Sequence, residues 1–246
     1  MSVDFRWKTF AQSLDNEVTR VLENADIHQP PVDPIRLARR LGIGVVLDAA
    51  QEPRGRQTRI AGRPSIFVRL DDRPERLHWA VAHELGETLA HQLFQQSGVE
   101  PADIDPPTRE RGANLAAARL LIPPAWFPAD VERTAGDLLA LKRRYETASH
   151  ELIAFRMLDL AAPAVVTVFD QGRQTRRRGN LAARVPPLDR LEQECWLAVR
   201  RFGRMHEVAR DGRRIQGWPI HEPQWQREIL RTTCVEWGPE EPPVDD

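Results

Sequence analysis

Hydrophobic side chains recur every three or four residues in several stretches of the chain, the spacing that places them on one face of an α-helix. Residues 8–24 show this pattern first, and residues 74–95 show it over a longer stretch. Asp33 followed by Pro34 is a favourable N-cap and first residue for a short helix that ends at Gly42. The same spacing predicts further helices over residues 108–122, over two segments within residues 136–160, and over residues 186–201.

Short runs rich in β-branched and aromatic residues stand between these helices and predict strands. They cover residues 44–47, 65–70, 165–169, 216–220 and 232–237. Because the first two runs come directly before the long helix over residues 74–95, we expect a small antiparallel sheet packed on that helix.

These elements predict an α+β protein with a domain boundary near residues 161–164. We expect a first domain over residues 1–128, a helical segment that looks like a helix-turn-helix over 129–161, and a smaller α+β C-terminal domain over 162–238. Residues 239–246 are rich in proline and acidic side chains, a composition typical of a disordered tail.

The composition of the chain limits which partners it can bind and in which cellular compartment we expect it. The 246 residues include 35 basic and 36 acidic side chains, and this net charge of −1 gives no field that would attract nucleic acid or an anionic membrane. Apolar runs are too short to span a bilayer, and the first twenty residues lack the apolar segment of a signal peptide. Cys195 and Cys234 are expected to be free thiols in a reducing compartment, so we expect a cytoplasmic protein.

The long helix contains the stretch His83–Glu87, with the sequence H-E-L-G-E, which differs at one position from the zinc-binding pattern H-E-x-x-H. In that pattern two histidines hold the metal, and the glutamate beside the first handles the proton of the metal-bound water. Here Glu87 replaces the second histidine, and a carboxylate is also a zinc ligand. His91 lies about 12 Å of helix rise from His83, too far for both to hold one ion. Gly86 leaves room for a neighbouring element.

A third ligand must come from another element, and Glu110, early in the next predicted helix, is the best placed acid. If it faces the same ion, its carboxylate should lie within about 4 to 5 Å of the His83 ring nitrogens. Two carboxylate ligands lower the Lewis acidity of the metal and shift its preference from Zn²⁺ towards harder ions such as Mn²⁺. The alternative is a metal-free polar helix face, with Glu84 and Glu87 paired to nearby arginines.

Two long motifs resemble those of the ImmA/IrrE family of bacterial metallopeptidases. Residues 82–91 are similar to A-H-E-L-G-H-x-x-x-H, with Glu87 as the departure, and residues 110–123 are similar to E-x-x-A-N-x-F-A-A-x-L-L-M-P. The glutamate that opens the second motif is the family's third zinc ligand and falls on Glu110. Residues 31–43 resemble an upstream motif of the family, and Leu139–Met157 resembles the helix-turn-helix-like stretch that follows its peptidase core.

The resemblance implies a zincin-like peptidase core in which His83, Glu87 and Glu110 hold zinc and Glu84 is the catalytic base. It also implies a cytosolic metallopeptidase whose substrate or partner is a helix-turn-helix repressor, and whose action relieves repression of stress-response or mobile-element genes. Because the departure at Glu87 falls on a ligand, a second function stays open. The chain would then be a catalytically weak or inactive member that binds and regulates its repressor without cleavage.

A third interpretation, a regulator that reads DNA with residues 137–158, is disfavoured by composition. The second predicted helix of that segment, residues 150–155, is mostly apolar, which is typical of a packing element rather than of a helix that contacts bases. Residues 173–178 are strongly basic, and we interpret them as a solvated turn or hairpin, with contact to an anion or an acidic partner as the alternative. We therefore expect no direct binding to nucleic acid and no membrane association.

Overall fold

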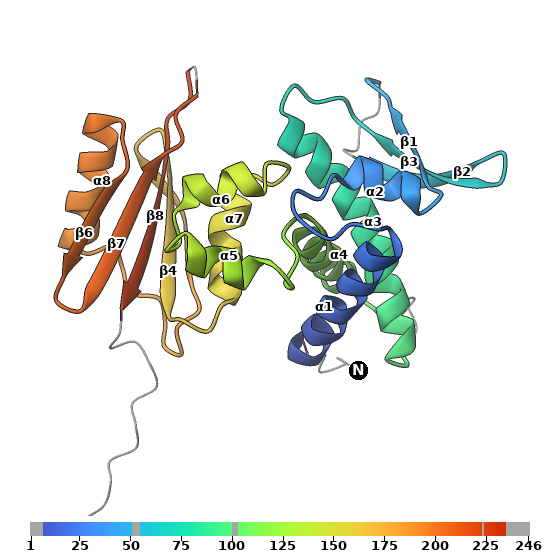
Figure 1. Ribbon diagram of the computed structural model, residues 1–246, viewed down its shortest axis with the longest axis horizontal. Helices are drawn as coiled ribbons and strands as arrows, with labels where there is room; N and C mark the ends of the chain where they lie inside the picture. Colours follow the sequence, from blue (N-terminus) through green and yellow to red (C-terminus); the bar gives the residue numbers. More distant parts are fainter. Residues whose placement is uncertain (1–6, 51–54, 100–102, 223, 235–246) are drawn as a thin grey trace, which may run out of the picture. The chain divides into compact units, whose positions relative to one another are not determined.

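The computed structural model describes residues 7–50, 55–99, 103–222 and 224–234 (Figure 1). The chain forms two compact units, one from Met1–Glu132 with Lys142–Ser149 and the other from Arg133–Leu141 with His150–Asp246. Both units combine helices with a sheet, which confirms the predicted α+β class. The predicted tail, residues 239–246, lies outside the described residues.

Helices build most of the first unit: α1 (Trp7–Asn24), α2 (Pro34–Arg40), α3 (Pro74–Gln96), α4 (Pro106–Leu121) and α5 (Phe127–Arg133). The buried face of α1 carries the apolar residues that predicted this helix. At the start of α2 the Asp33 side chain accepts hydrogen bonds from the amides of Ile35 and Arg36, so the predicted N-cap is present. The helix α5 was not predicted from the sequence.

A small sheet of β1 (Gly44–Leu47), β2 (Gly55–Ile60) and β3 (Arg63–Val68) lies beside α3, with the strand order β1-β3-β2. The strands β2 and β3 are antiparallel and are joined at Ala61 and Gly62, which both have positive φ. The expectation that residues 44–47 and 65–70 pair antiparallel was wrong, because β1 and β3 are parallel. Strand β2 runs opposite in direction to both β1 and β3, so β3 returns in the direction of β1.

Helices α3 and α4 pack closely at Gly86, as the sequence predicted. A Cβ atom at this position would lie 2.6 Å from the carbonyl oxygen of Ala113 and 3.1 Å from the Cβ of Ala116. Real side chains do not approach a backbone oxygen so closely, so only glycine permits this contact. The close approach brings the first turns of α4 to the polar face of α3.

Substituting Gly86 by alanine is expected to destabilise the protein by about 1 to 3 kcal/mol, the usual cost of overpacking a core. The direction of the change in unfolding free energy is informative, because Gly→Ala at an exposed position of a helix stabilises by about 0.5 to 1 kcal/mol. Urea unfolding gives the change, and Gln95→Ala on an exposed position of α3 is the matched control with an expected change within about 0.5 kcal/mol. A stabilised G86A protein would show that α3 and α4 are not in this contact.

In the second unit an antiparallel sheet has the strand order β5-β4-β8-β7-β6. Its strands are β4 (Ala164–Asp170), β5 (Arg173–Gly179), β6 (His206–Arg210), β7 (Arg213–Pro219) and β8 (Arg227–Cys234). Helix α8 (Arg190–Phe202) packs Cys195 and Val199 on one face of the sheet, while α7 (His150–Arg156) contacts β4 and β8 (Figure 1). Helix α6 (Leu138–Arg144) begins in the second unit and ends in the first, and residues 145–149 separate it from α7, as predicted. The short helix η2 (Met157–Asp159) follows α7.

Two details of the second unit refine the sequence predictions. The basic residues 173–178 belong to β5, in a hairpin with β4. Helix α8 begins at Arg190 rather than at Pro186, because Asp189 and Glu192 form a reciprocal capping box at its start. Neither correction changes the order of elements.

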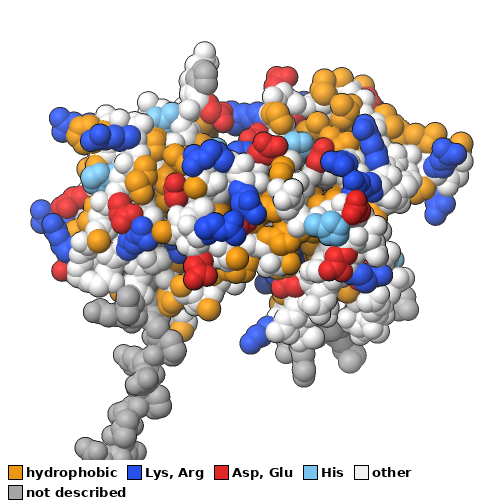
Figure 2. Space-filling model, viewed as in Figure 1, with side chains coloured by type: hydrophobic (Ala, Val, Ile, Leu, Met, Phe, Trp, Pro, Cys, Tyr) orange, Lys and Arg blue, Asp and Glu red, His pale blue; other side chains and the backbone are white. Residues whose placement is uncertain are grey.

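The surface carries both charges without a continuous patch of one sign on the face shown in Figure 2, in line with the net charge of −1. Among the described residues, no helix is long and apolar enough to cross a membrane.

Candidate metal centre

The structure brings the three predicted ligands together. His83 and Glu87 lie one turn apart on α3, and Glu110 lies near the start of α4. The Nε2 atom of His83 is 3.6 Å from Oε1 of Glu87 and 3.6 Å from Oε2 of Glu110. One ligand atom from each residue lies within 4.8 Å of the other two. The separation between Glu110 and His83 is thus within the limit of about 4 to 5 Å expected from the sequence.

This geometry fits a divalent metal ion. Zinc bonds of about 2.0 to 2.2 Å in a tetrahedral site place neighbouring ligand atoms about 3.3 to 3.6 Å apart. Both distances from His83 agree with this separation, and two carboxylates balance the charge of a dication. The side chains of Glu87 and Glu110 are 52% and 58% exposed, so the cluster opens to solvent on their side.

Asn114 fixes the orientation of the His83 ring. Its Oδ1 atom lies 3.2 Å from Nδ1 of His83, and its Nδ2 atom donates a hydrogen bond of 2.9 Å to Oε1 of Glu110. Because an amide oxygen only accepts hydrogen bonds, Nδ1 of His83 carries the proton and Nε2 keeps a lone pair towards the carboxylates. The role of Asn114 was not predicted, although its position one turn after Glu110 on the same helix was the available signal.

The electrostatics of the cluster favour a cation between its members. The close approach of the Glu87 carboxylate is the largest cause that raises the pKa of His83, and Glu110 adds to it. The same contact with His83 lowers the pKa of Glu87, with a smaller contribution from Arg109. A proton on His83 occupies the place where a metal ion would satisfy both carboxylates.

Glu84, the predicted base, lies on the buried side of the centre. It is 5% exposed, and a Cβ atom at Gly55 of strand β2 would overlap its Oε1 atom. The side chain of Gln57 ties β2 to α3 by donating to the backbone oxygen of Glu84 and to the hydroxyl of Thr88. Burial and the nearby charge of Glu87 raise the pKa of Glu84 to about 7, a value suited to accepting and returning a proton.

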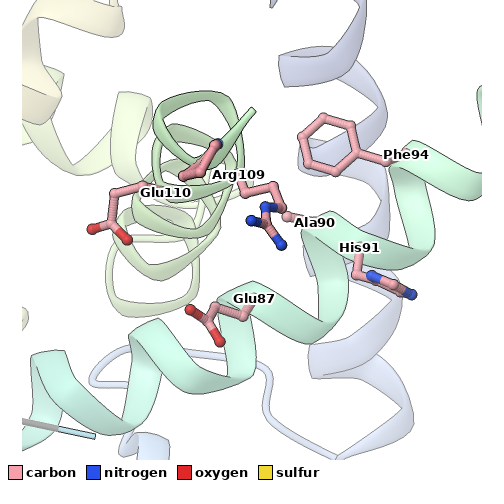
Figure 3. Close-up of a pocket in the computed structure, with 7 residues that line it drawn as sticks. Glu87, Ala90, His91, Phe94, Arg109 and Glu110 are labelled. Atoms are coloured by element: carbon pink, nitrogen blue, oxygen red, sulfur yellow. The ribbon is translucent and has the colours of Figure 1, made fainter. Parts of the chain in front are cut away.

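An open pocket of about 380 Å³ adjoins the centre (Figure 3). Its lining residues are Glu87, Ala90, His91, Phe94, Pro106, Arg109 and Glu110. Glu87 and Glu110 therefore face both the pocket and His83. His91 lines this pocket but is not part of the ligand cluster, as expected from its distance along the helix.

Comparisons with known proteins agree with this architecture. A family model described as the IrrE N-terminal-like domain, of the M78 peptidases, matches residues 38–158. Among solved structures, a Mycobacterium tuberculosis transcriptional regulator superposes with a TM-score of 0.62 at 17% sequence identity, covering 91% of this chain and 76% of that chain. At this identity the likeness shows a shared fold. No curated protein matches the chain significantly.

Proposed function

The chain belongs, through residues 38–158, to the family with an IrrE N-terminal-like domain, and on this premise we propose that it is a metal-dependent peptidase. Its substrate would be a helix-turn-helix transcriptional repressor, whose cleavage relieves repression of stress-response or mobile-element genes. The observation that carries the proposal is the convergence of His83, Glu87 and Glu110 on one point next to buried Glu84.

Each residue of the centre would have a defined task. His83, Glu87 and Glu110 hold the ion, and Asn114 keeps Nε2 of His83 turned towards it. When bound, zinc or a harder ion such as Mn²⁺ supplies a Lewis acid that activates water and polarises the peptide carbonyl. Glu84 accepts a proton from the attacking water and delivers it to the leaving amine. Its burial excludes bulk water from this proton transfer.

Glu87 makes this centre different from one with two histidines. A second carboxylate puts more negative charge on the ion, which lowers its Lewis acidity, so slower hydrolysis is expected. Oxygen ligands also favour harder ions over zinc. This departure is the reason to keep a second function, a weak or inactive protein that binds and regulates its repressor without cutting it.

Nucleic-acid binding by the helical segment is not part of the proposal. Three of its basic side chains are engaged within their own unit: Lys142 contacts Glu75, Arg144 contacts Asp130, and Arg156 contacts Asp159. Ile153 and Ala154 of α7 are buried. Basic side chains that already form ion pairs, and a helix face that is buried, are not available to contact nucleic-acid bases. The structural relative is described as a transcriptional regulator, which supports a regulatory role without indicating how it acts.

The test of the proposed function is cleavage of a helix-turn-helix protein encoded next to this gene. The full chain is loaded with Zn²⁺ or Mn²⁺ and incubated with that protein, and intact mass spectrometry detects the fragments. We expect a single cut that a chelator abolishes. An uncut repressor that forms a stable complex with the metal-loaded chain would favour the second function instead.

A further inference from the structure

We propose that the pocket beside the metal centre recognises a carboxylate of the substrate through Arg109, so that the bond cut lies next to an acidic side chain or a chain end. This inference rests on the proposed function and names its substrate class. The pocket is the one lined by Glu87, Ala90, His91, Phe94, Pro106, Arg109 and Glu110, called here the Arg109 pocket (Figure 3).

Arg109 projects its guanidinium into this pocket between α3 and α4 (Figure 3). Among the residues that the structure describes, none forms an ion pair or hydrogen bond with this guanidinium. Arginine presents its donors as a planar fork that matches the two oxygens of a carboxylate. A guanidinium that forms no ion pair with the described residues, in a pocket that shares two residues with the metal cluster, is therefore placed to bind an anionic group of a bound peptide.

At the start of α4 no backbone amide is free to bind an anion, so the side chain of Arg109 is the group that can do so. Pro106 and Pro107 have no amide hydrogen, and the amide of Thr108 already donates to the Asp105 side chain. The amide of Arg109 donates to the backbone oxygen of Asp105. The first turn of the helix thus offers no free backbone donor, and the guanidinium of Arg109 and the ring of His91 are the donors that face the pocket.

The apolar part of the pocket lining, Ala90 and Phe94, suits the methylene groups of an acidic side chain. Ala90 and Phe94 are 2% and 1% exposed, so the pocket reaches into the core packing. The Phe94 ring stacks on Phe10 at 4.8 Å, and Gly112 of α4 approaches it closely. These contacts fix this part of the lining, so binding need not order it first.

Charge explains why the pocket would act only with metal present. Glu87 and Glu110 face the same space and would repel a carboxylate. A bound dication would balance these two charges, so that a carboxylate could approach the guanidinium of Arg109 without their repulsion. Metal binding and recognition of the substrate carboxylate would therefore support each other.

Binding of three short peptides tests the inference. One is a capped alanine pentapeptide with a central Glu, the second has Gln in its place, and the third ends at that Gln with a free carboxylate. Calorimetry measures each on the full chain carrying Glu84→Gln and loaded with Zn²⁺, because this variant should not cut them. The same measurements follow on Arg109→Gln, Arg109→Lys and Arg111→Gln in that background. Arg111 is the matched control, since its guanidinium stacks on Trp7 outside the pocket.

We expect the Glu peptide to bind about tenfold more tightly than the Gln peptide, the size of a charge-assisted hydrogen bond. This ratio should fall to about one in Arg109→Gln, remain in part in Arg109→Lys, and be unchanged in Arg111→Gln. Tight binding of the third peptide would identify the chain end as the source of the carboxylate, and preference for the first would identify a side chain.

Two results would overturn the inference. Equal affinity for all three peptides would show that the pocket does not recognise a carboxylate. A preference that persists in Arg109→Gln would show that the carboxylate binds the metal instead. Metal content measured on the same samples separates this from failure of the proposed function. A chain that takes up no metal contradicts the peptidase proposal, whereas a metal-loaded chain whose carboxylate preference does not depend on Arg109 contradicts the pocket proposal alone.

Discussion

Replacing Glu84 by Gln is expected to lower the rate of repressor cleavage by about 10² to 10⁴-fold, the usual contribution of a general base. The amide keeps the size of the carboxylate but cannot accept the proton of the attacking water. The metal content should stay at the parent level, because Glu84 is not one of the three clustered ligands. Cleavage rate and metal content are measured on the same preparation.

The control for this variant is Glu23→Gln, which makes the same chemical change at an exposed position of α1. It should leave both the rate and the metal content unchanged. If Glu84→Gln cleaved as fast as the parent, the base would have to be another group. If it lost the metal, Glu84 would be needed for the ligand cluster, and the division of roles within H-E-x-x-E would be wrong.

Replacing Glu87 by His is expected to tighten zinc binding by about tenfold or more and to match or raise the cleavage rate. An imidazole in this place gives the two-histidine, one-carboxylate ligand set of zinc peptidases and leaves the ion more Lewis acidic. The rest of the centre needs no rearrangement, because Glu87 already lies 3.6 Å from Nε2 of His83. Competition with a chelating dye gives the affinities.

Glu87→Ala completes this comparison, since it removes the ligand without replacing it and should strip the metal. The order expected for zinc affinity is therefore His, then the natural Glu, then Ala. Equal affinity for the Glu and Ala forms would mean that Glu87 is not a ligand. If the parent and Glu87→His both remained metal-free, the chain would differ from an active centre by more than this residue, and the non-cleaving binder would be the better interpretation.

The sequence predicted that His83, Glu87 and Glu110 lie close together because the signals for their closeness are local. His83 and Glu87 must share a face of any helix, and the closeness of α4 is signalled by Gly86 within the same motif. Glu110 could be proposed from its place at the start of the next helix, and the family motif pointed to the same residue. The helices were also predicted well, because a long apolar face specifies both the period and the buried side.

Features that depend on tertiary approach were not predictable from local pattern. Strand β2 is polar and mostly exposed, so its sequence shows no buried alternation, and it forms through pairing with β3. Two contacts of the site join residues about thirty positions apart in the sequence: Gly55 lies against the side chain of Glu84, and Asn114 forms a hydrogen bond with His83. The parallel pairing of β1 with β3 likewise follows from the path of the connecting chain rather than from either strand.

The metal content of the purified parent chain tests the central claim most directly. After exposure to equimolar Zn²⁺ or Mn²⁺ and removal of free ions, elemental analysis should find one divalent ion per chain. Glu110→Ala, which removes one ligand from the exposed side of the cluster, should retain almost none while keeping the circular dichroism spectrum of the parent. A metal-free parent, or a Glu110→Ala protein with the same content as the parent, would contradict the assignment of His83, Glu87 and Glu110 as a metal centre.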